Sequence, residues 1–166
     1  MPAILRVTIS ILASSYFFSD YFALSSSNPD FVYFARLGSC VSIAITAGLL
    51  IALMLDPAAS VLRRMIGMLH DIAAISASLY LGEGAASAVA AIYLWVVLGN
   101  GFRYGNVYLY ASAILSICSF GAVYLTSEYW RGQTTLSINI MLLLALIPPY
   151  VGVLLNSLHK AKQQLK

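Results

Sequence analysis

The polar side chains that could bind a ligand or carry a signal stand out because the chain around them is apolar. The densest group separates two long apolar runs, in the stretch Leu98-Gly99-Asn100-Gly101-Phe102-Arg103-Tyr104-Gly105. Its glycines allow a sharp turn and close approach of other groups. Gly-Asn-Gly alone is ordinary turn chemistry, but Asn100 and Arg103 offer more hydrogen-bonding groups than a chain reversal needs. We therefore predict a turn here that takes part in binding or signalling.

Two further charges stand inside apolar runs, Asp71 in residues 65–81 and Arg36 in residues 31–55. A charge at the centre of a bilayer costs about 2.5–3.5 kcal/mol on insertion scales, so Asp71 should face protein or become protonated. Arg103 is its natural partner, in a structural ion pair or in a switch that changes partners when helices move. Arg36 would anchor its helix by snorkelling outward, or would bind a carboxylate through two parallel hydrogen bonds.

The composition assigns these residues to a membrane protein. Hydrophobic residues make up 61% of the chain and charged residues 9%, against about 25% charged residues in a soluble domain. A bilayer core about 30 Å thick requires about 20 mostly apolar residues per helix, and the chain contains several runs of that kind. We therefore predict an all-α, polytopic membrane protein.

Six apolar runs are separated by turn residues, and each is a candidate transmembrane helix. They are residues 2–24, 31–55, 65–81, 85–98, 106–126 and 134–158. The first run could instead be a cleaved signal peptide, but aromatic residues stand where that reading requires small ones. The count falls to five if the first run is cleaved, or if the short fourth run only re-enters the membrane.

The basic residues predict the orientation of these helices. If the amino terminus is inside, the inner segments contain Arg6, Arg63, Arg64, Arg103, Lys160, Lys162 and Lys166. The outer turns then contain only Arg131, next to Tyr129 and Trp130, which are typical of an interfacial aromatic belt. This asymmetry follows the positive-inside rule. We predict six transmembrane helices with both termini in the cytoplasm.

Several motifs occur in an order that resembles a known family. They are Arg63-Arg64-Met65-Ile66-Gly67-Met68-Leu69-His70-Asp71, Tyr93-Leu94-Trp95-Val96, the stretch 99–105, Tyr129-Trp130 and Ile147-Pro148-Pro149-Tyr150. In this order they resemble the membrane sensor region of one group of bacterial hybrid histidine kinases. These kinases are similar to the sensor for diffusible signal factor, a cis-2-unsaturated fatty acid. The resemblance covers residues 60–166 well, and the first two runs by general pattern.

The resemblance implies a sensory input domain of a two-component histidine kinase in the bacterial inner membrane. Residues 1–158 would form the transmembrane sensor, and residues 159–166 would begin the helix that leads to the kinase. The chain itself would not be an enzyme. Its signal would be small and lipophilic, as in quorum sensing, and its partners the lipid bilayer, a second copy and the kinase in the same polypeptide. We expect no cofactor, metal ion or nucleic-acid partner.

The candidate functional residues combine the polar side chains with the motifs. For ligand binding or signalling they are Arg36, Asp71, Trp95, Asn100, Arg103, Tyr104, Glu128 and Trp130. Pro148 and Pro149 should kink the last helix and act as its hinge. A heptad pattern after them indicates the start of a two-stranded coiled coil, on Val151, Leu154, Leu158, Ala161 and Leu165.

Two other functions are open to a membrane protein of this size. A small transporter or channel subunit would need a polar path, yet the runs contain few ionisable residues and no evident inverted repeat. A passive membrane anchor agrees with the heptad pattern but does not need the polar groups of Asn100 and Arg103.

Overall fold

The computed structural model describes residues 2–20, 29–55 and 61–164. Within these ranges every regular element is a helix, as predicted. The chain divides into two compact units, Met1–Ser87 and Ala88–Lys166, which are taken here in turn.

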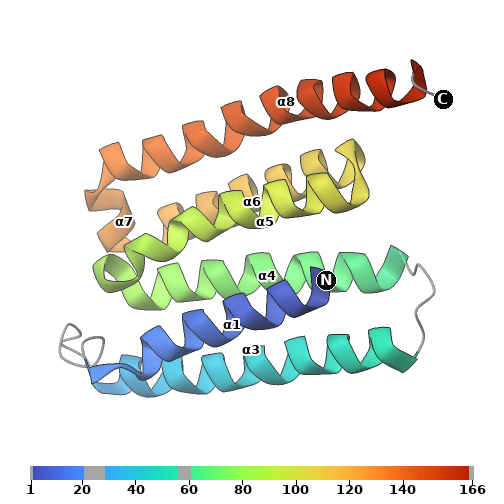
Figure 1. Cartoon of the computed structure of the whole chain (residues 1–166). Helices are drawn as coiled ribbons and strands as arrows, with labels where there is room; N and C mark the ends of the chain where they lie inside the picture. The colour runs from blue at the N-terminus through green and yellow to red at the C-terminus, as the bar shows by residue number, and fades with distance from the viewer. Residues whose placement is uncertain (1, 21–28, 56–60, 165–166) are drawn as a thin grey trace. The chain divides into compact units, whose positions relative to one another are not determined.

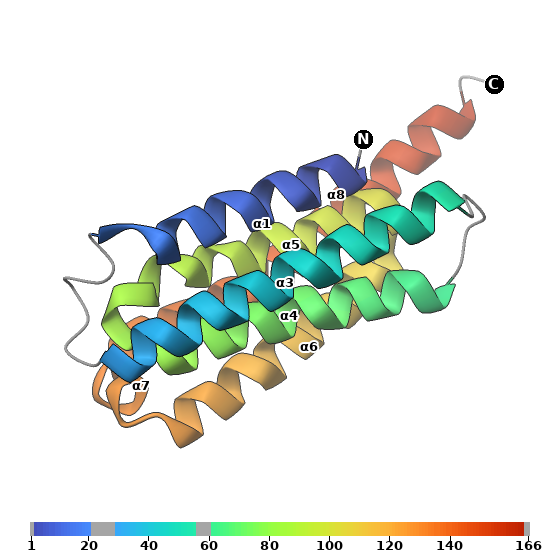
Figure 2. The same ribbon diagram turned by 90° about the horizontal axis from the view of Figure 1, so that it is seen from below.

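The first unit contains three long helices, α1 (Pro2–Phe18), α3 (Pro29–Leu55) and α4 (Val61–Gly82). Helices α1 and α3 form an antiparallel pair, and α4 returns alongside α3 (Figures 1 and 2). Helix α3 begins at Pro29. Proline suits the first turn of a helix, because backbone N–H groups there have no partner within the helix. The first predicted helix extended to residue 24, and residues 21–24 lie outside the described ranges.

The second unit begins within a short 3₁₀ helix, η1 (Glu83–Val89), which follows α4. Its helices are α5 (Ala90–Tyr104), α6 (Asn106–Thr126), α7 (Glu128–Gly132) and α8 (Thr134–Gln164). Helices α5 and α6 form an antiparallel hairpin, α7 caps the far end of α6, and α8 runs back along both α6 and α5 (Figure 1).

The reversal between α5 and α6 is shorter than the sequence predicted. Helix α5 continues to Tyr104, so the predicted turn over residues 98–105 is wrong for all of its residues but the last. Gly105 makes the reversal alone with φ +90°, and its N–H donates to the Gly101 carbonyl at 2.9 Å. Glycine adopts this backbone conformation at little steric cost, so one residue turns the chain. The fourth helix, predicted over 85–98, is likewise displaced: residues 85–89 belong to η1, and α5 extends from Ala90 to Tyr104.

An aromatic cluster forms the core where α6, α7 and α8 meet. The Trp130 side chain is 0% exposed, so its prediction as part of an interfacial belt is wrong. Its ring makes an edge-to-face contact with Phe120 at 5.4 Å, and Phe120 makes another with Tyr93 at 6.2 Å. Such pairs contribute about 0.5–1.5 kcal/mol each beyond area burial. The Trp130 carbonyl also accepts a hydrogen bond from Ser137 Oγ at 3.0 Å.

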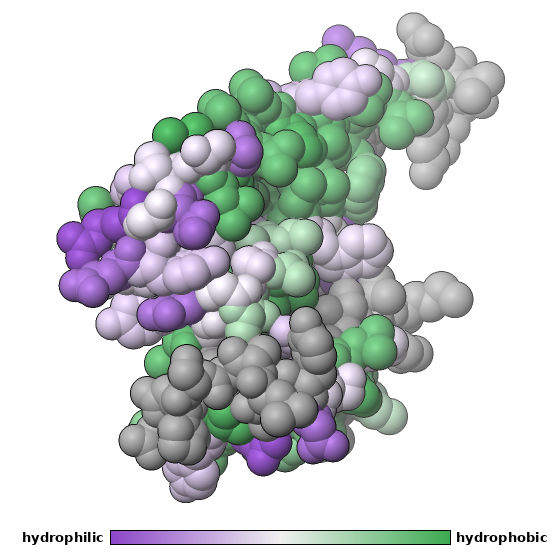
Figure 3. Space-filling view, turned by 90° about the vertical axis from the view of Figure 1, so that its left-hand side faces the viewer, coloured by the Kyte–Doolittle hydropathy of each residue, from purple (hydrophilic) through white to green (hydrophobic). Residues whose placement is uncertain are grey.

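Four stretches of the described residues are long and apolar enough to cross a membrane. They are Val32–Ala52, Val61–Tyr104, Asn106–Thr126 and Thr134–Leu158. The second has 44 residues and comprises α4, η1 and α5, which is about twice the length that one crossing requires. In Figure 3 hydrophilic residues gather at the end of the helices that faces the viewer, and hydrophobic residues cover the surface behind that end. The chain is therefore a helical membrane protein, and the count of six spans stays a prediction.

Helix α8 continues beyond its apolar run. It contains 31 residues, from Thr134 to Gln164, and passes through Pro148 and Pro149 without interruption. At 1.5 Å per residue it is about 46 Å long, more than a bilayer core of about 30 Å requires. The prediction that the last helix runs out of the apolar stretch in one piece is thus confirmed as far as Gln164.

Candidate functional site

A hydrogen-bonded contact joins the first residue of α6 to the far part of α8. The side-chain N–H₂ of Asn106 donates to the Asn156 side-chain oxygen at 2.7 Å and reaches the Gly152 carbonyl at 3.4 Å. Between membrane helices, such amide contacts hold two backbones in one register.

Glycines bring three helices unusually close together beside this contact. A Cβ at Gly152 would collide with the hydroxyl of Tyr110, and a Cβ at Gly101 would lie 2.6 Å from Leu109 Cδ1. Small residues permit this approach in membrane proteins, where tight packing replaces the hydrophobic effect between helices. We call Asn106, Tyr110, Gly152 and Asn156 the α6–α8 junction.

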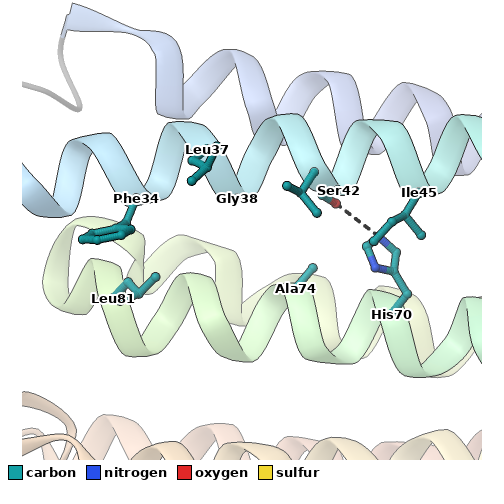
Figure 4. Close-up of a pocket in the computed structure, with 9 residues that line it drawn as sticks. Phe34, Leu37, Gly38, Ser42, Ile45, His70, Ala74 and Leu81 are labelled. Carbon is teal, nitrogen blue, oxygen red and sulfur yellow. Dashed lines mark hydrogen bonds between the residues drawn. The ribbon is translucent and has the colours of Figure 1, made fainter.

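The first unit contains an apolar groove between α3 and α4, with a volume of about 570 Å³ (Figure 4). Helix α3 lines it with Phe34, Leu37, Gly38, Val41, Ser42 and Ile45. Helix α4 lines it with His70, Ala74 and Leu81. One polar contact crosses the groove, between Ser42 Oγ and His70 Nε2 at 3.2 Å. Figure 4 shows this pair at one end and Phe34 with Leu81 at the other.

Arg36 connects α3 to α1 and is half-buried. Its Nε–H donates to the Phe17 carbonyl at 3.5 Å, and its guanidinium carbon lies 5.7 Å from the centre of the Phe18 ring. A cation held over an aromatic face gains about 0.5–2 kcal/mol, more when water is excluded. These contacts use one of the five guanidinium N–H donors. The two predicted roles of Arg36, as a helix anchor or as a carboxylate-binding residue, both stay predictions.

The structure does not gather the predicted site residues into one place. In the second unit, Asn100, Arg103 and Tyr104 lie in the last part of α5, beside the α6–α8 junction. Asn100 is buried at 3% exposure, and the Tyr104 ring lies 5.2 Å from that of Tyr108. Glu128 and Trp130 lie on α7, at the opposite end of α6. These residues therefore form two separate groups.

The remaining candidates are divided between the two units. Trp95, on α5, is 53% exposed, which is compatible with contact to lipid or to a second copy. Arg36 and Asp71 belong to the first unit. The proposed pair of Asp71 with Arg103 joins one unit to the other and stays a prediction.

Sequence reasoning missed the residues that make the two clearest polar contacts. No sequence pattern distinguishes Ser42 or His70 from a single tolerated polar residue in an apolar run. Asn106 and Asn156 are 50 residues apart, so no local spacing connects them. The available signal was general: hydrogen-bonding side chains in membrane helices usually find a partner on another helix.

Comparison with known proteins supports the resemblance found in the motifs. No protein-family model matches the chain, and no solved structure does. The sensory/regulatory protein RpfC from two strains of Xanthomonas campestris pv. campestris is 37% identical to it over 123 residues. The matched region is 74% of this chain but 17% of the relative. The chain is thus similar, over about three quarters of its length, to about one sixth of a sensory/regulatory protein of the RpfC kind.

Proposed function

We propose that this chain is the membrane sensory input region of a histidine kinase, and that α8 carries the signal to a kinase in the same polypeptide. Similarity to a sensory/regulatory protein supports the sensory role. The α6–α8 junction is the observation that supports the output role. It connects the α5–α6 hairpin to the part of α8 that continues beyond the apolar run.

In this proposal the chain crosses a bacterial inner membrane six times, with both ends in the cytoplasm. The α6–α8 junction then lies near the cytoplasmic face, because Arg103 precedes Asn106 by three residues and Lys160 follows Asn156 by four. Basic residues near the ends of membrane helices favour that side. The signal is a small, lipophilic, fatty-acid-like molecule that reaches the helices through the bilayer.

Transmission requires two arrangements of the helices that the signal stabilises differently. A shift of the α5–α6 hairpin would pull on α8 through Asn106, since the Asn106–Asn156 contact and the close approach at Gly152 leave little room for independent sliding. Helix α8 would then rotate or tilt, and two copies of it would present different faces to one another at the start of a coiled coil.

Insertions into α8 test this output role in the full-length protein. One residue inserted after His159 rotates everything beyond it by about 100°, because a helix has 3.6 residues per turn. Autophosphorylation should then be locked on or off and should no longer respond to the signal. Seven inserted residues restore the facing and should largely preserve the response. If both insertions leave the response unchanged, α8 only tethers the kinase and the chain is a membrane anchor.

Cross-linking tests whether two copies meet along the heptad positions. Cysteines replacing Leu158 or Leu165 should form disulfides between copies faster than cysteines replacing Lys160 or Gln163, which lie off the seam. Leu165 falls outside the described residues, whereas Leu158 is on α8 and 64% exposed. Equal cross-linking at all four positions would contradict the dimer.

A further inference from the structure

The segment η1, which joins α4 to α5, has a strained backbone. It forms a 3₁₀ helix of seven residues, whereas runs longer than three or four residues are uncommon because the hydrogen-bond geometry is poorer than in an α-helix. Its first residue, Glu83, has φ +44°, and it is the only residue other than glycine with a positive φ in the described chain. Residues with a Cβ rarely adopt this conformation. Such a backbone persists only where the surrounding structure holds it in place.

The hydroxyl of Tyr16, on α1, holds η1 from outside. It donates a hydrogen bond to the Ala85 carbonyl at 2.6 Å. Both residues belong to the first unit, which ends two residues after Ala85, at Ser87. The carboxyl end of α1 and the start of η1 lie at the same end of this unit (Figures 1 and 2). Because the bond joins residues 69 positions apart, it forms only when the end of α1 is in its place.

The end of α1 is in turn fixed by α3. Helix α1 ends at Phe18, so the carbonyls of its last turn have no partner within the helix, and an unpaired carbonyl in apolar surroundings is costly. Ser19 donates to the Tyr16 carbonyl through its N–H at 3.1 Å and its Oγ at 2.6 Å. Arg36 donates to the Phe17 carbonyl at 3.5 Å. A cation at the carboxyl end of a helix is also favoured by the helix dipole. Arg36 therefore positions the turn of α1 that carries Tyr16.

We propose that η1 is a hinge and that Tyr16 is its latch: the Tyr16–Ala85 hydrogen bond keeps η1 in its strained 3₁₀ form. When the end of α1 moves, this bond breaks and η1 relaxes toward an α-helix. A 3₁₀ helix rises about 2.0 Å per residue and an α-helix 1.5 Å, so seven residues shorten by about 3.5 Å and α5 begins in a different place. The effect of this change on the kinase rests on the proposed sensory function, whereas the latch itself does not.

Hydrogen exchange tests the latch on the full-length protein in phosphatidylcholine nanodiscs. Tyr16→Phe removes only the hydroxyl and keeps the ring that contacts Phe17. Backbone amides of residues 83–89 should then exchange about three- to tenfold faster, the effect of losing one hydrogen bond, while those of α3 keep their rates. Tyr33→Phe is the matched control, because it removes the hydroxyl of a tyrosine that is 65% exposed on α3. Unchanged exchange of η1 in Tyr16→Phe would overturn the latch.

A double variant tests whether Arg36 acts through Tyr16. The printed contacts of Arg36 are with the end of α1, yet Arg36→Gln should accelerate exchange of η1, because the turn that carries Tyr16 becomes free to move. Combined with Tyr16→Phe, it should add little further acceleration, since residues that act through one contact are not additive. If the two accelerations multiply, Arg36 does not position Tyr16 and this part of the proposal is wrong.

A variant with the opposite effect tests the hinge. Glycine adopts the backbone conformation of Glu83 at little cost and disfavours an α-helix. Glu83→Gly should therefore favour the present form of η1 and slow exchange of residues 84–89. In the full-length protein, Tyr16→Phe and Glu83→Gly should shift the signal concentration for half-maximal autophosphorylation in opposite directions. A role of η1 in stability alone would not reverse the sign of this shift.

The two measurements separate the hinge from the sensory function. If exchange changes as expected but both variants respond to the signal like the unchanged protein, η1 is not a hinge for the signal and the proposal fails. If the unchanged full-length protein shows no signal-dependent phosphorylation, the sensory function is refuted, and hydrogen exchange still decides whether Tyr16 holds η1.

Discussion

The side-chain amide of Asn106 donates to the side-chain oxygen of Asn156 at 2.7 Å, which connects the start of α6 to the last third of α8. The same amide nitrogen reaches the Gly152 carbonyl, one turn earlier on α8. The side-chain oxygen of Asn106 makes no matching hydrogen bond. Asn106 Oδ1 is buried without a hydrogen-bond partner in the described chain. The contact is therefore directional, from α6 to α8.

A double-mutant cycle should detect this contact as a coupling energy. Asn106→Ala and Asn156→Ala should each destabilise the protein, and the double variant should be less damaged than the sum of the two. Interhelical side-chain hydrogen bonds in membranes average about 0.6 kcal/mol and reach about 1.7 kcal/mol, so we expect a coupling in that range. Unfolding in mixed micelles measures it. Ser157→Ala is the control, because Ser157 Oγ donates to the Val153 carbonyl in its own helix and not to α6.

Replacing Gly101 by alanine should destabilise the α5–α6 hairpin by about 1–3 kcal/mol, as overpacking does. The new Cβ would lie 2.6 Å from Leu109 Cδ1, so the buried Leu109 side chain or one of the two helices must shift. Gly99→Ala is the matched control on the same helix: no atom lies within 4 Å of its Cβ, and alanine favours a helix by up to about 1 kcal/mol. Adding Leu109→Ala to Gly101→Ala should remove the clash. Thermal unfolding distinguishes the three variants, and equal stability of the two alanine variants would contradict the prediction.

Asp71 and Arg103 should behave as one charge pair. Asp71→Arg and Arg103→Asp should each impair membrane insertion or signalling, because each leaves two like charges near the membrane boundary. The double exchange should restore much of the lost function. Protein yield in the membrane and signal-dependent phosphorylation are the measurements. Additive damage in the double variant would show that the two residues do not interact.

Reporter fusions should place the loop around Ser60 and the residues after Lys166 on the cytoplasmic side. Fusions after Ser60 and after Lys166 should report cytoplasm, and a fusion after Gly84 should report the outer side, because the basic residues favour this orientation. Residues 60 and 166 lie outside the described ranges, whereas Gly84 lies in η1. An outer signal at Ser60 would overturn the six-span arrangement.

The sequence predicted the elements of this protein better than its contacts. Apolar runs separated by polar residues identify membrane helices because length and hydrophobicity decide insertion. The exact site of a reversal depends on one backbone angle, and the sequence does not distinguish the three glycines of the stretch 98–105. In the structure Gly105 has φ +90° and makes the turn, whereas Gly101 packs against the Leu109 side chain. The position of Trp130 differs from its prediction for a related reason. Its amphipathic ring suits an interface, and only the fold of α7 against α6 and α8 buries it.

The candidate site was harder to predict because its contacts join distant residues. The hydrogen-bonding groups of Asn100 predict a site at that residue, and Asn100 is buried. The amide that connects α6 to α8 nevertheless belongs to Asn106. The groove depends on the absence of side-chain bulk at Gly38 and Ala74 on two facing helices. Periodicity within one helix does not specify which neighbour it faces, so a groove of this kind is visible only in the assembled structure.

If the two consecutive prolines of α8 act as the predicted hinge, this helix works as a lever. Neither Pro148 nor Pro149 can donate to the carbonyl four residues earlier, so two hydrogen bonds are missing at a single turn and bending is easiest there. From Pro148 to Gln164 the arm measures about 24 Å at 1.5 Å per residue. Each degree of bend therefore displaces its tip by about 0.4 Å. Asn156, which contacts Asn106, lies halfway between Pro148 and Gln164. A small displacement applied at Asn156 would therefore be doubled at Gln164.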